Sequence, residues 1–361
     1  MTLAAPGAVA IGALEPSHVD ADLVAHYGDP LREQRLLATA VGLVDRGNRG
    51  VLTVAGPDRL SWLHSLSTQH LLELAPATGT ELLVLSPHGH VEHHAVVLDD
   101  ATTTWLDVEP GTAPALLDFL NRMRFLLRVE PVDVTADWAV LSLVGPATGD
   151  ALAALGVTDP APPQLQAVPG PKFPAGSVPT GPTSRYAVVP LASGGYARRM
   201  RYGADLIVAR AAVPELVARA AVPLAGMWAF EALRVADRRP RLGLDTDHRT
   251  LPAEVGWTAP AVHLEKGCYR GQETVARVHN LGRPPRRLVL LHLDGVSTDE
   301  LPAPGTPVTG EDARPVGFVG TAARHFELGP VALALVKRSL GEEARLRVGV
   351  AAAAIDPEAR D

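Results

Sequence analysis

The chain has one cysteine, Cys268, and the residues around it are of types that activate a thiol. Lys266 and Arg270 flank it, and either cation would favour the thiolate from within a few ångströms. Gly267 and Gly271 allow backbone conformations that a β-carbon forbids. A reactive thiol is one interpretation of this segment, K-G-C-Y-R-G-Q-E. The other is a small, buried and inert cysteine in a tight loop, because free cysteine commonly packs as a small hydrophobic residue.

Histidines crowd a predicted hairpin turn around Gly89. They are His88, His90, His93 and His94. If a strand begins near His90, alternation places His90, Glu92 and His94 on one face. Two imidazoles and a carboxylate can hold a divalent metal. Histidines near a turn are more often solvated or bonded to the backbone, so we assign no metal and keep a metal-binding scaffold as an alternative.

The composition excludes several classes of protein. The chain of 361 residues is too long for one ordinary core and predicts two or three domains. The net charge is -7 and no long run of Lys or Arg occurs, so we expect no nucleic-acid partner. One cysteine excludes an internal disulfide framework and an iron–sulfur site whose thiolates all come from this chain.

No apolar run reaches the roughly 18 residues of a spanning helix, and no secretory signal is apparent. We therefore expect a cytoplasmic protein with no membrane partner. The sequence also has no Walker A loop and no G-x-G-x-x-G after a strand, so no motif supports nucleotide-dependent chemistry. No G-x-S-x-G elbow is present either.

The elements that must position these groups follow from the apolar pattern. A strand over 81–85 and its partner over 91–98 flank the turn sequence S-P-H-G and carry the histidines. Helical spacing predicts helices over 30–39, from 58 onward, and over 114–123, 213–220 and 227–237. Further strands are predicted over 51–54, 104–108, 138–144, 185–190 and 196–201.

The distribution of residue types along the chain predicts three parts. The Ala, Gly and Pro content of residues 1–27 predicts a flexible lead-in, and the prolines of 159–184 predict a long exposed loop within the main region, 28–283. From residue 284 to 361, short strand-like runs alternate with Gly, Pro and Asp turns, which is typical of a small all-β barrel or sandwich.

The segment from Lys266 to Arg277, K-G-C-Y-R-G-Q-E-T-V-A-R, resembles the signature of the YgfZ family, K-G-C-Y-x-G-Q-E. The flanking stretches E-A-L-R at 231–234, L-P-A-E at 251–254 and G-R-P-P-R-R-L at 282–288 are also similar. The runs G-F-V-G-T-A and L-G-P-V-A-L-A-L-V-K-R, which ends at Arg338, resemble the barrel of the related glycine-cleavage aminomethyltransferases. The resemblance covers most of residues 28–353.

This resemblance implies an α+β protein, with GcvT-like folate-binding α/β domains followed by a small C-terminal β-barrel. It implies tetrahydrofolate or a derivative as cofactor, and a role in assembling or repairing iron–sulfur clusters in other proteins. The partners would be iron–sulfur assembly proteins and client enzymes. In that family the signature cysteine is tied to function, so Cys268 takes that role. The folate contacts nominated in this way are Glu92, Asp205, Glu231, Arg234, Lys266, Tyr269 and Gln272.

Two of these assignments have alternatives. Arg234 could meet a glutamyl carboxylate of folate bidentately, or form an ordinary (i, i+3) surface pair with Glu231. In the aminomethyltransferases paired acids follow the hairpin glycine, whereas here Glu92-His93 stands in their place. Glu92 is one methylene longer than Asp and His93 has no obligate negative charge, which counts against glycine-cleavage chemistry but not against folate binding.

We therefore expect a tetrahydrofolate-binding accessory factor for iron–sulfur proteins. The alternative is a folate-dependent aminomethyltransferase or methyltransferase, which would need Glu92 as its acid. Whether the protein is an enzyme is left open by the sequence.

Overall fold

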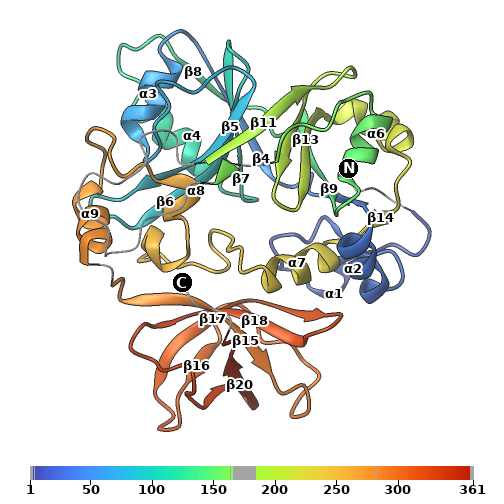
Figure 1. Ribbon diagram of the computed structural model, residues 1–361, viewed down its shortest axis with the longest axis vertical. Coiled ribbons are helices and arrows are strands. Elements are labelled where there is room, and N and C mark those ends of the chain that lie inside the picture. Colours follow the sequence, from blue (N-terminus) through green and yellow to red (C-terminus); the bar gives the residue numbers. More distant parts are fainter. Residues whose placement is uncertain (1–2, 4, 163, 166–183, 282, 358–361) are drawn as a thin grey trace.

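The computed structural model describes residues 3, 5–162, 164–165, 184–281 and 283–357 (Figure 1). Of the exposed loop predicted over 159–184, residues 163 and 166–183 lie outside the described residues. The helical elements are α1 (Ile11–Leu14), α2 (Pro30–Thr39), α3 (Arg59–Leu66), α4 (Ala113–Arg122), α5 (Thr148–Ala154), η1 (Arg210–Ala212), α6 (Val213–Ala220), α7 (Met227–Ala236), η2 (Pro252–Glu254), α8 (Thr258–Ala261) and α9 (Gln272–Leu281). None of the helices described is long and apolar enough to cross a bilayer.

Twelve of the described strands form one sheet, in which all pairs are antiparallel except β14 with β3. In spatial order they are β14 (Leu224–Ala225), β3 (Gly42–Asp45), β9 (Trp138–Val144), β13 (Gly203–Ala209), β12 (Tyr196–Met200), β11 (Ser184–Pro190), β5 (Thr78–Leu85), β6 (Val91–Asp99), β7 (Thr103–Val108), β4 (Gly50–Ala55) and β8 (Glu130–Asp133). Strand β10 (Gln164–Leu165) pairs with β11 at the side of this path.

Each half of the sheet has its own core. Strands β4, β5, β6 and β7 pack against α3 and α4 through a cluster that includes Leu52, Trp62 and Leu116. Strands β3, β9 and β13 pack against α5 and α6 through a second cluster, which includes Leu141 and Leu216. The faces turned away from these helices meet each other in a third cluster, drawn from both halves.

The hairpin of β5 and β6 forms as its sequence predicts. The N–H of Ser86 donates to the carbonyl of His90 at 2.8 Å, and Gly89 has a φ of +81°, a region that favours glycine. Along β6, alternation turns Ala95 into the core under α4 and turns His94 to the opposite face.

The C-terminal region is a closed six-stranded barrel, as the sequence predicts. Its strands, in order, are β15 (Arg286–Leu293), β18 (Gly329–Lys337), β17 (Pro315–His325), β16 (Pro307–Thr309), β19 (Leu346–Val348) and β20 (Ala351–Ile355). Figure 1 shows the barrel below the sheet, with α7 between them. Ala232 and Val235 of α7 contact Leu290 and Leu333 of the barrel, so α7 connects the two regions. The α+β architecture is confirmed.

The flexible lead-in predicted over residues 1–27 is wrong for most of that stretch. Strands β1 (Val9–Ala10) and β2 (Val24–His26) pair with each other around α1. Ile11 and Leu23 are buried against Phe230 of α7. The carboxylate of Asp20, which is 1% exposed, pairs with Arg241. Contacts with residues more than 200 positions away order this segment, and its local composition carries no sign of them.

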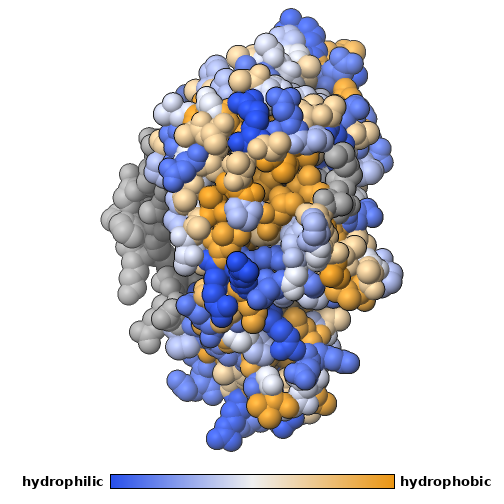
Figure 2. Space-filling view, turned by 90° about the vertical axis from the view of Figure 1, so that its right-hand side faces the viewer, coloured by the Kyte–Doolittle hydropathy of each residue, from blue (hydrophilic) through white to orange (hydrophobic). Residues whose placement is uncertain are grey.

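On the face of the molecule in Figure 2, apolar side chains gather over the upper, α/β part, and a band of hydrophilic side chains lies below them, toward the barrel. A cavity lies inside the α/β part, between the two half-sheets and α7.

Candidate functional site

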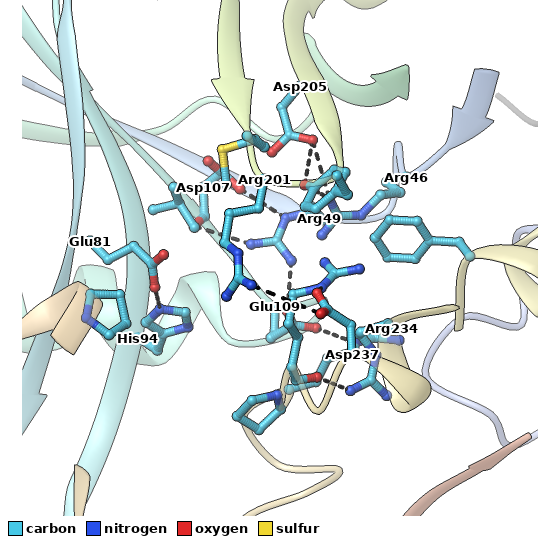
Figure 3. Close-up of a pocket in the computed structure, with 18 of the residues that line it drawn as sticks. Arg46, Arg49, Glu81, His94, Asp107, Glu109, Arg201, Asp205, Arg234 and Asp237 are labelled. Carbon is cyan, nitrogen blue, oxygen red and sulfur yellow. Dashed lines mark hydrogen bonds and ion pairs between the residues drawn. The ribbon is translucent and has the colours of Figure 1, made fainter. Parts of the chain in front are cut away.

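A cavity of about 370 Å³ is lined by strands from both half-sheets, by α7 and by the segments 237–241 and 255–260 (Figure 3). This volume is in the range of small-molecule sites. Arg201 and Asp237, whose side chains are about half exposed, lie at its rim, whereas most of the charged residues within it are buried. The cavity thus has a solvent-facing mouth and a desolvated floor.

The floor is a continuous network of buried ion pairs. Arg198 lies between two carboxylates, with Nη1 2.6 Å from Asp107 Oδ1 and Nη2 2.9 Å from Asp205 Oδ2. Arg49 continues the network, with Nε 2.9 Å from Asp107 Oδ2 and Nη1 2.7 Å from Glu109 Oε1. Burial raises the pKa of Asp205, but neighbouring arginines more than offset this and hold that pKa at about 2. Its carboxylate is therefore ionised at neutral pH.

A second set of ion pairs ties α7 and the N-terminal segment to this floor. Arg241 Nε lies 2.7 Å from Glu109 Oε2, and its Nη1 lies 2.6 Å from Asp20 Oδ2. Arg234 Nη2 lies 2.8 Å from Glu231 Oε2. Burial raises the pKa of Glu231, but the charges of Arg234 and Arg241 outweigh burial and lower this pKa to about 2. The (i, i+3) pair of Glu231 and Arg234 is thus buried, so the surface-pair alternative is wrong.

Aromatic rings and guanidinium groups stack on the α7 side of the cavity. The Cζ atom of Arg46 lies 4.7 Å from the centroid of the Phe230 ring, and the Cζ atom of Arg239 lies 4.5 Å from that of Tyr202. Burial lowers the pKa of the Arg239 guanidinium. Such stacks hold the guanidinium groups against the ring faces, while Arg46 Nη1 lies 3.3 Å from Asp205 Oδ1 and Arg239 Nε lies 2.9 Å from Asp237 Oδ2.

The opposite wall combines a histidine, a carboxylate and two aromatic residues. His94 Nε2 lies 2.7 Å from Glu81 Oε2, and the hydroxyl of Tyr186 donates to Glu81 Oε1. The His94 ring stacks on Trp257, with ring centroids 4.6 Å apart. Figure 3 shows Glu81 and His94 on the same wall, with the Glu81 carboxylate above the His94 ring and a hydrogen bond between them. Alternation placed His94 on a common face with Glu92, but nothing in the sequence predicted its partners.

The structure divides the predicted folate contacts into two groups. Asp205 and Arg234 line the cavity, and Glu231 lies directly behind Arg234. The remaining predicted contacts do not line it: they are Glu92, Lys266, Tyr269 and Gln272. Cys268 does not line it either. The signature segment therefore lies beside the cavity, on α9 and the loop before it, and those four side chains are no part of the cavity lining.

Lys266 has a structural role in this segment. Its Nζ donates to the main-chain carbonyls of His64, Ser67 and Gln69, where α3 ends, with a distance of 2.5 Å to Ser67. Burial lowers the pKa of Lys266 to about 7. Gln272 Nε2 in turn donates to the carbonyl of Lys266 at 3.1 Å. These residues hold the segment to α3 because orphan carbonyls at a helix C-terminus need donors.

Tyr269 and Cys268, neighbours in the chain, have opposite environments. The Tyr269 side chain is buried in an apolar cluster with Leu85 and Val91, and burial raises the pKa of its hydroxyl. Cys268 is exposed, so the inert buried cysteine is wrong. The two flanking cations have partners of their own: Lys266 donates to main-chain carbonyls, and Arg270 pairs with Glu92.

The histidine hairpin does not form a metal centre in the described part of the chain, where no group of three or more His, Cys, Asp or Glu side chains could hold a metal ion. His94 turns to Glu81, and Glu92, at 37% exposed, turns to Arg270.

Comparisons with known proteins agree with this architecture. Residues 26–168 match the family model of the GCVT N-terminal domain. An aminomethyltransferase of Symbiobacterium thermophilum is 27% identical over 301 residues, which are 80% of this chain and 78% of that protein. A provisionally named chloroplastic transferase of Arabidopsis thaliana is 27% identical over 299 residues, again 80% of this chain; the match spans 65% of its own length.

Among solved structures, the glycine cleavage system aminomethyltransferase T from Bartonella henselae superimposes with a TM-score of 0.71 at 19% identity, covering 90% of this chain and 87% of that one. At that identity the likeness shows the fold alone. The chain therefore has a GcvT-like fold with a C-terminal barrel. The narrower YgfZ family is not established by these matches and rests on the signature segment.

Proposed function

We propose that the central cavity binds tetrahydrofolate or a close derivative. The observation that carries this proposal is a single cavity, at the centre of a GcvT-like fold, that combines aromatic faces with buried carboxylates and a cationic mouth. The aminomethyltransferase name of one relative gives the cofactor class independent support. A reduced pterin is a flat ring rich in N–H groups, which suits aromatic walls and carboxylate acceptors.

The charges of the cavity suit the two ends of such a ligand. Ion pairs within the protein neutralise the floor, where Asp205 and Asp107 are held by Arg198. At the mouth, Arg201 and Arg238 are partly exposed; Arg201 lies 4.0 Å from Asp237, and Arg238 lies 3.2 Å from Asp356. A glutamyl tail carries carboxylates, so we expect it at the mouth and the pterin ring inside.

We further propose that the protein is an accessory factor for assembling or repairing iron–sulfur clusters, with assembly proteins and client enzymes as partners. This part rests on the signature K-G-C-Y-R-G-Q-E and on the exposure of Cys268. Because Cys268 lies outside the cavity, its thiol is directed at a partner protein and not at folate. Any cluster that it handles needs further ligands from that partner, since the chain has no second cysteine.

Two measurements test the proposal. Isothermal titration of the purified protein with tetrahydrofolate under argon should show one site per chain, and Cys268→Ala should bind equally well. In cells lacking the gene, iron–sulfur enzyme activities should fall and return with the wild-type gene but not with Cys268→Ala. Absence of binding would contradict the folate site, and equal rescue by both genes would contradict the role of the thiol.

A folate-dependent transferase is the second candidate, since both sequence relatives are named as transferases. Glu92, the acid that the sequence offered for this chemistry, lies outside the cavity, so His94 or a cavity carboxylate would have to serve. Product formation from tetrahydrofolate and methylamine donors, lost in His94→Gln but not in Glu92→Gln, would favour it. If the protein turns over none of these donors, the transferase function is contradicted and the accessory role remains.

A further inference from the structure

Three side chains on neighbouring strands form a hydrogen-bonded chain that ends in the cavity. Strand β11 pairs with β5, and β5 pairs with β6, with Leu83 opposite His94. Tyr186 of β11 donates to one oxygen of Glu81, and His94 Nε2 lies 2.7 Å from the other. The order Tyr186–Glu81–His94 is therefore built into the sheet.

This arrangement determines which nitrogen of His94 carries the proton. Burial raises the pKa of Glu81, but the contacts with His94 and Tyr186 and the charge of Arg198 more than offset this and bring it below its usual value, so the carboxylate is ionised and can only accept. Burial raises the pKa of Tyr186 well above 10, so its hydroxyl keeps the proton that it donates. His94 Nε2 must then be the donor to Glu81. In the neutral imidazole the other nitrogen, Nδ1, has no hydrogen and can only accept.

The ring is also fixed in space. It stacks on Trp257 with an interplanar angle of 23°, and its side chain is 11% exposed. Among the described residues, no hydrogen bond to His94 Nδ1 is found, and His94 lines the cavity. With a neutral imidazole, the wall therefore presents a single acceptor in a fixed orientation.

We propose that His94 makes the cavity selective for reduced pterins, because its Nδ1 accepts a hydrogen bond from N5–H or N8–H of the ligand. This inference rests on the proposed folate site and specifies which redox form of folate the site binds. In tetrahydrofolate the N5 and N8 positions carry hydrogens, whereas in folic acid both are aromatic nitrogens with lone pairs. A site built for a donor rejects an analogue that lacks it, since two acceptors would face each other.

Glu81 and Tyr186 provide a matched pair of variants. In Glu81→Gln the new amide can donate to Nε2, so the proton of His94 is free to move to Nδ1 and the wall becomes a donor. In Tyr186→Phe the carboxylate of Glu81 remains an acceptor, so the orientation of the proton is kept. If these three hydrogen-bonded side chains had only a structural role, both variants would lose affinity for tetrahydrofolate and for folic acid to the same extent.

The test compares the affinities of tetrahydrofolate and folic acid under argon. We expect the wild type and Tyr186→Phe to prefer tetrahydrofolate by about tenfold or more, the effect of leaving a buried acceptor unpaired. In Glu81→Gln this ratio should fall to about one or reverse. Equal affinities in the wild type, or an unchanged ratio in Glu81→Gln, would overturn the inference. No binding of either folate would overturn the proposed folate site and the inference with it.

A second measurement needs no ligand and does not depend on the folding of a variant. Nitrogen-15 NMR of the wild-type imidazoles should show His94 with hydrogen on Nε2 and a bare Nδ1, with assignment from the spectrum of His94→Gln. A wild-type His94 that carries hydrogen on Nδ1 would overturn the inference, even if tetrahydrofolate binds.

Discussion

Arg270 and Glu92 join the signature segment to the histidine hairpin through a bidentate ion pair, with Nη1 3.1 Å from Oε2 and Nη2 3.2 Å from Oε1. Both side chains are more than one-third exposed, and neither lines the cavity. Two residues for which the sequence suggested chemistry thus join the start of β6 to the segment before α9 at the surface.

Glu92→Gln should therefore leave the affinity for tetrahydrofolate within about twofold of the wild type. Its free energy of unfolding should fall by less than about 1 kcal/mol, because exposed ion pairs contribute little. Titration calorimetry and urea denaturation measure the two quantities. Asp205→Asn is the comparison from within the cavity, and we expect it to weaken binding by about tenfold or more. A larger effect of Glu92→Gln than of Asp205→Asn would contradict the placement of the site.

Gly271 offers a sharper test of the same contact. Its φ is +82°, and a β-carbon there would lie 2.6 Å from the carbonyl oxygen of Ser86 and 2.8 Å from Cα of Gly89. Gly271→Ala should lower the free energy of unfolding by about 1–3 kcal/mol, through backbone strain and the forced separation of the two loops.

Gly267→Ala is the matched control in the same signature, because no atom lies within 4 Å of its β-carbon position and its φ is not in the left-handed region. Urea denaturation of both variants decides the point. Equal stability of Gly271→Ala and Gly267→Ala would mean that the hairpin and the signature are not in close contact.

Local patterns predicted the elements but not the floor of the cavity. The turn sequence S-P-H-G and the alternation after it were sufficient to predict the β5–β6 hairpin and the common face of Glu92 and His94. These signals work because they depend on neighbours a few residues apart. The barrel strands were found in the same way.

The cavity is assembled from residues far apart in the chain. Asp20 and Arg241 are separated by 221 positions, and Tyr186 lies 105 positions from Glu81. Each looks like an ordinary polar residue in its own segment, and only the closing of the sheet brings the pairs together. The signature segment shows the same limit. Its sequence suggested that Lys266 activates the thiol, but in the fold the Lys266 ammonium donates to main-chain carbonyls after α3, a contact that the local sequence does not reveal.

Arg198 tests how much the buried network matters for folding. It lies between Asp107 and Asp205 with its side chain 1% exposed. Arg198→Met should lower the free energy of unfolding by about 3–5 kcal/mol, because it leaves two buried carboxylates without their common cation. Arg314→Met is the control, since Arg314 pairs with Asp312 at the surface and its side chain is 85% exposed. We expect a change of less than about 1 kcal/mol there. Similar losses in the two variants would contradict the network.

The pH dependence of stability tests the environment of Lys266. Burial lowers the pKa of its ammonium to about 7 in the folded chain, against roughly 10.4 in an unfolded one. Between these values the unfolded state binds more protons, so the free energy of unfolding rises with pH, by up to about 1.4 kcal/mol per unit. Relative to Lys266→Met, which lacks this titration, the wild type should therefore gain stability from pH 7 to pH 9.5.

Urea denaturation at half-unit steps of pH measures this difference, with Lys337→Met as the control from an exposed position on β18. Burial and the charge of Lys266 lower the pKa of the neighbouring His64 to about 4, so its imidazole is neutral throughout and does not contribute. The carbonyls of Ser67 and Gln69 act in the opposite direction, because they solvate the ammonium. A difference between wild type and Lys266→Met that stays flat over this range would mean that those carbonyls outweigh burial and keep Lys266 charged.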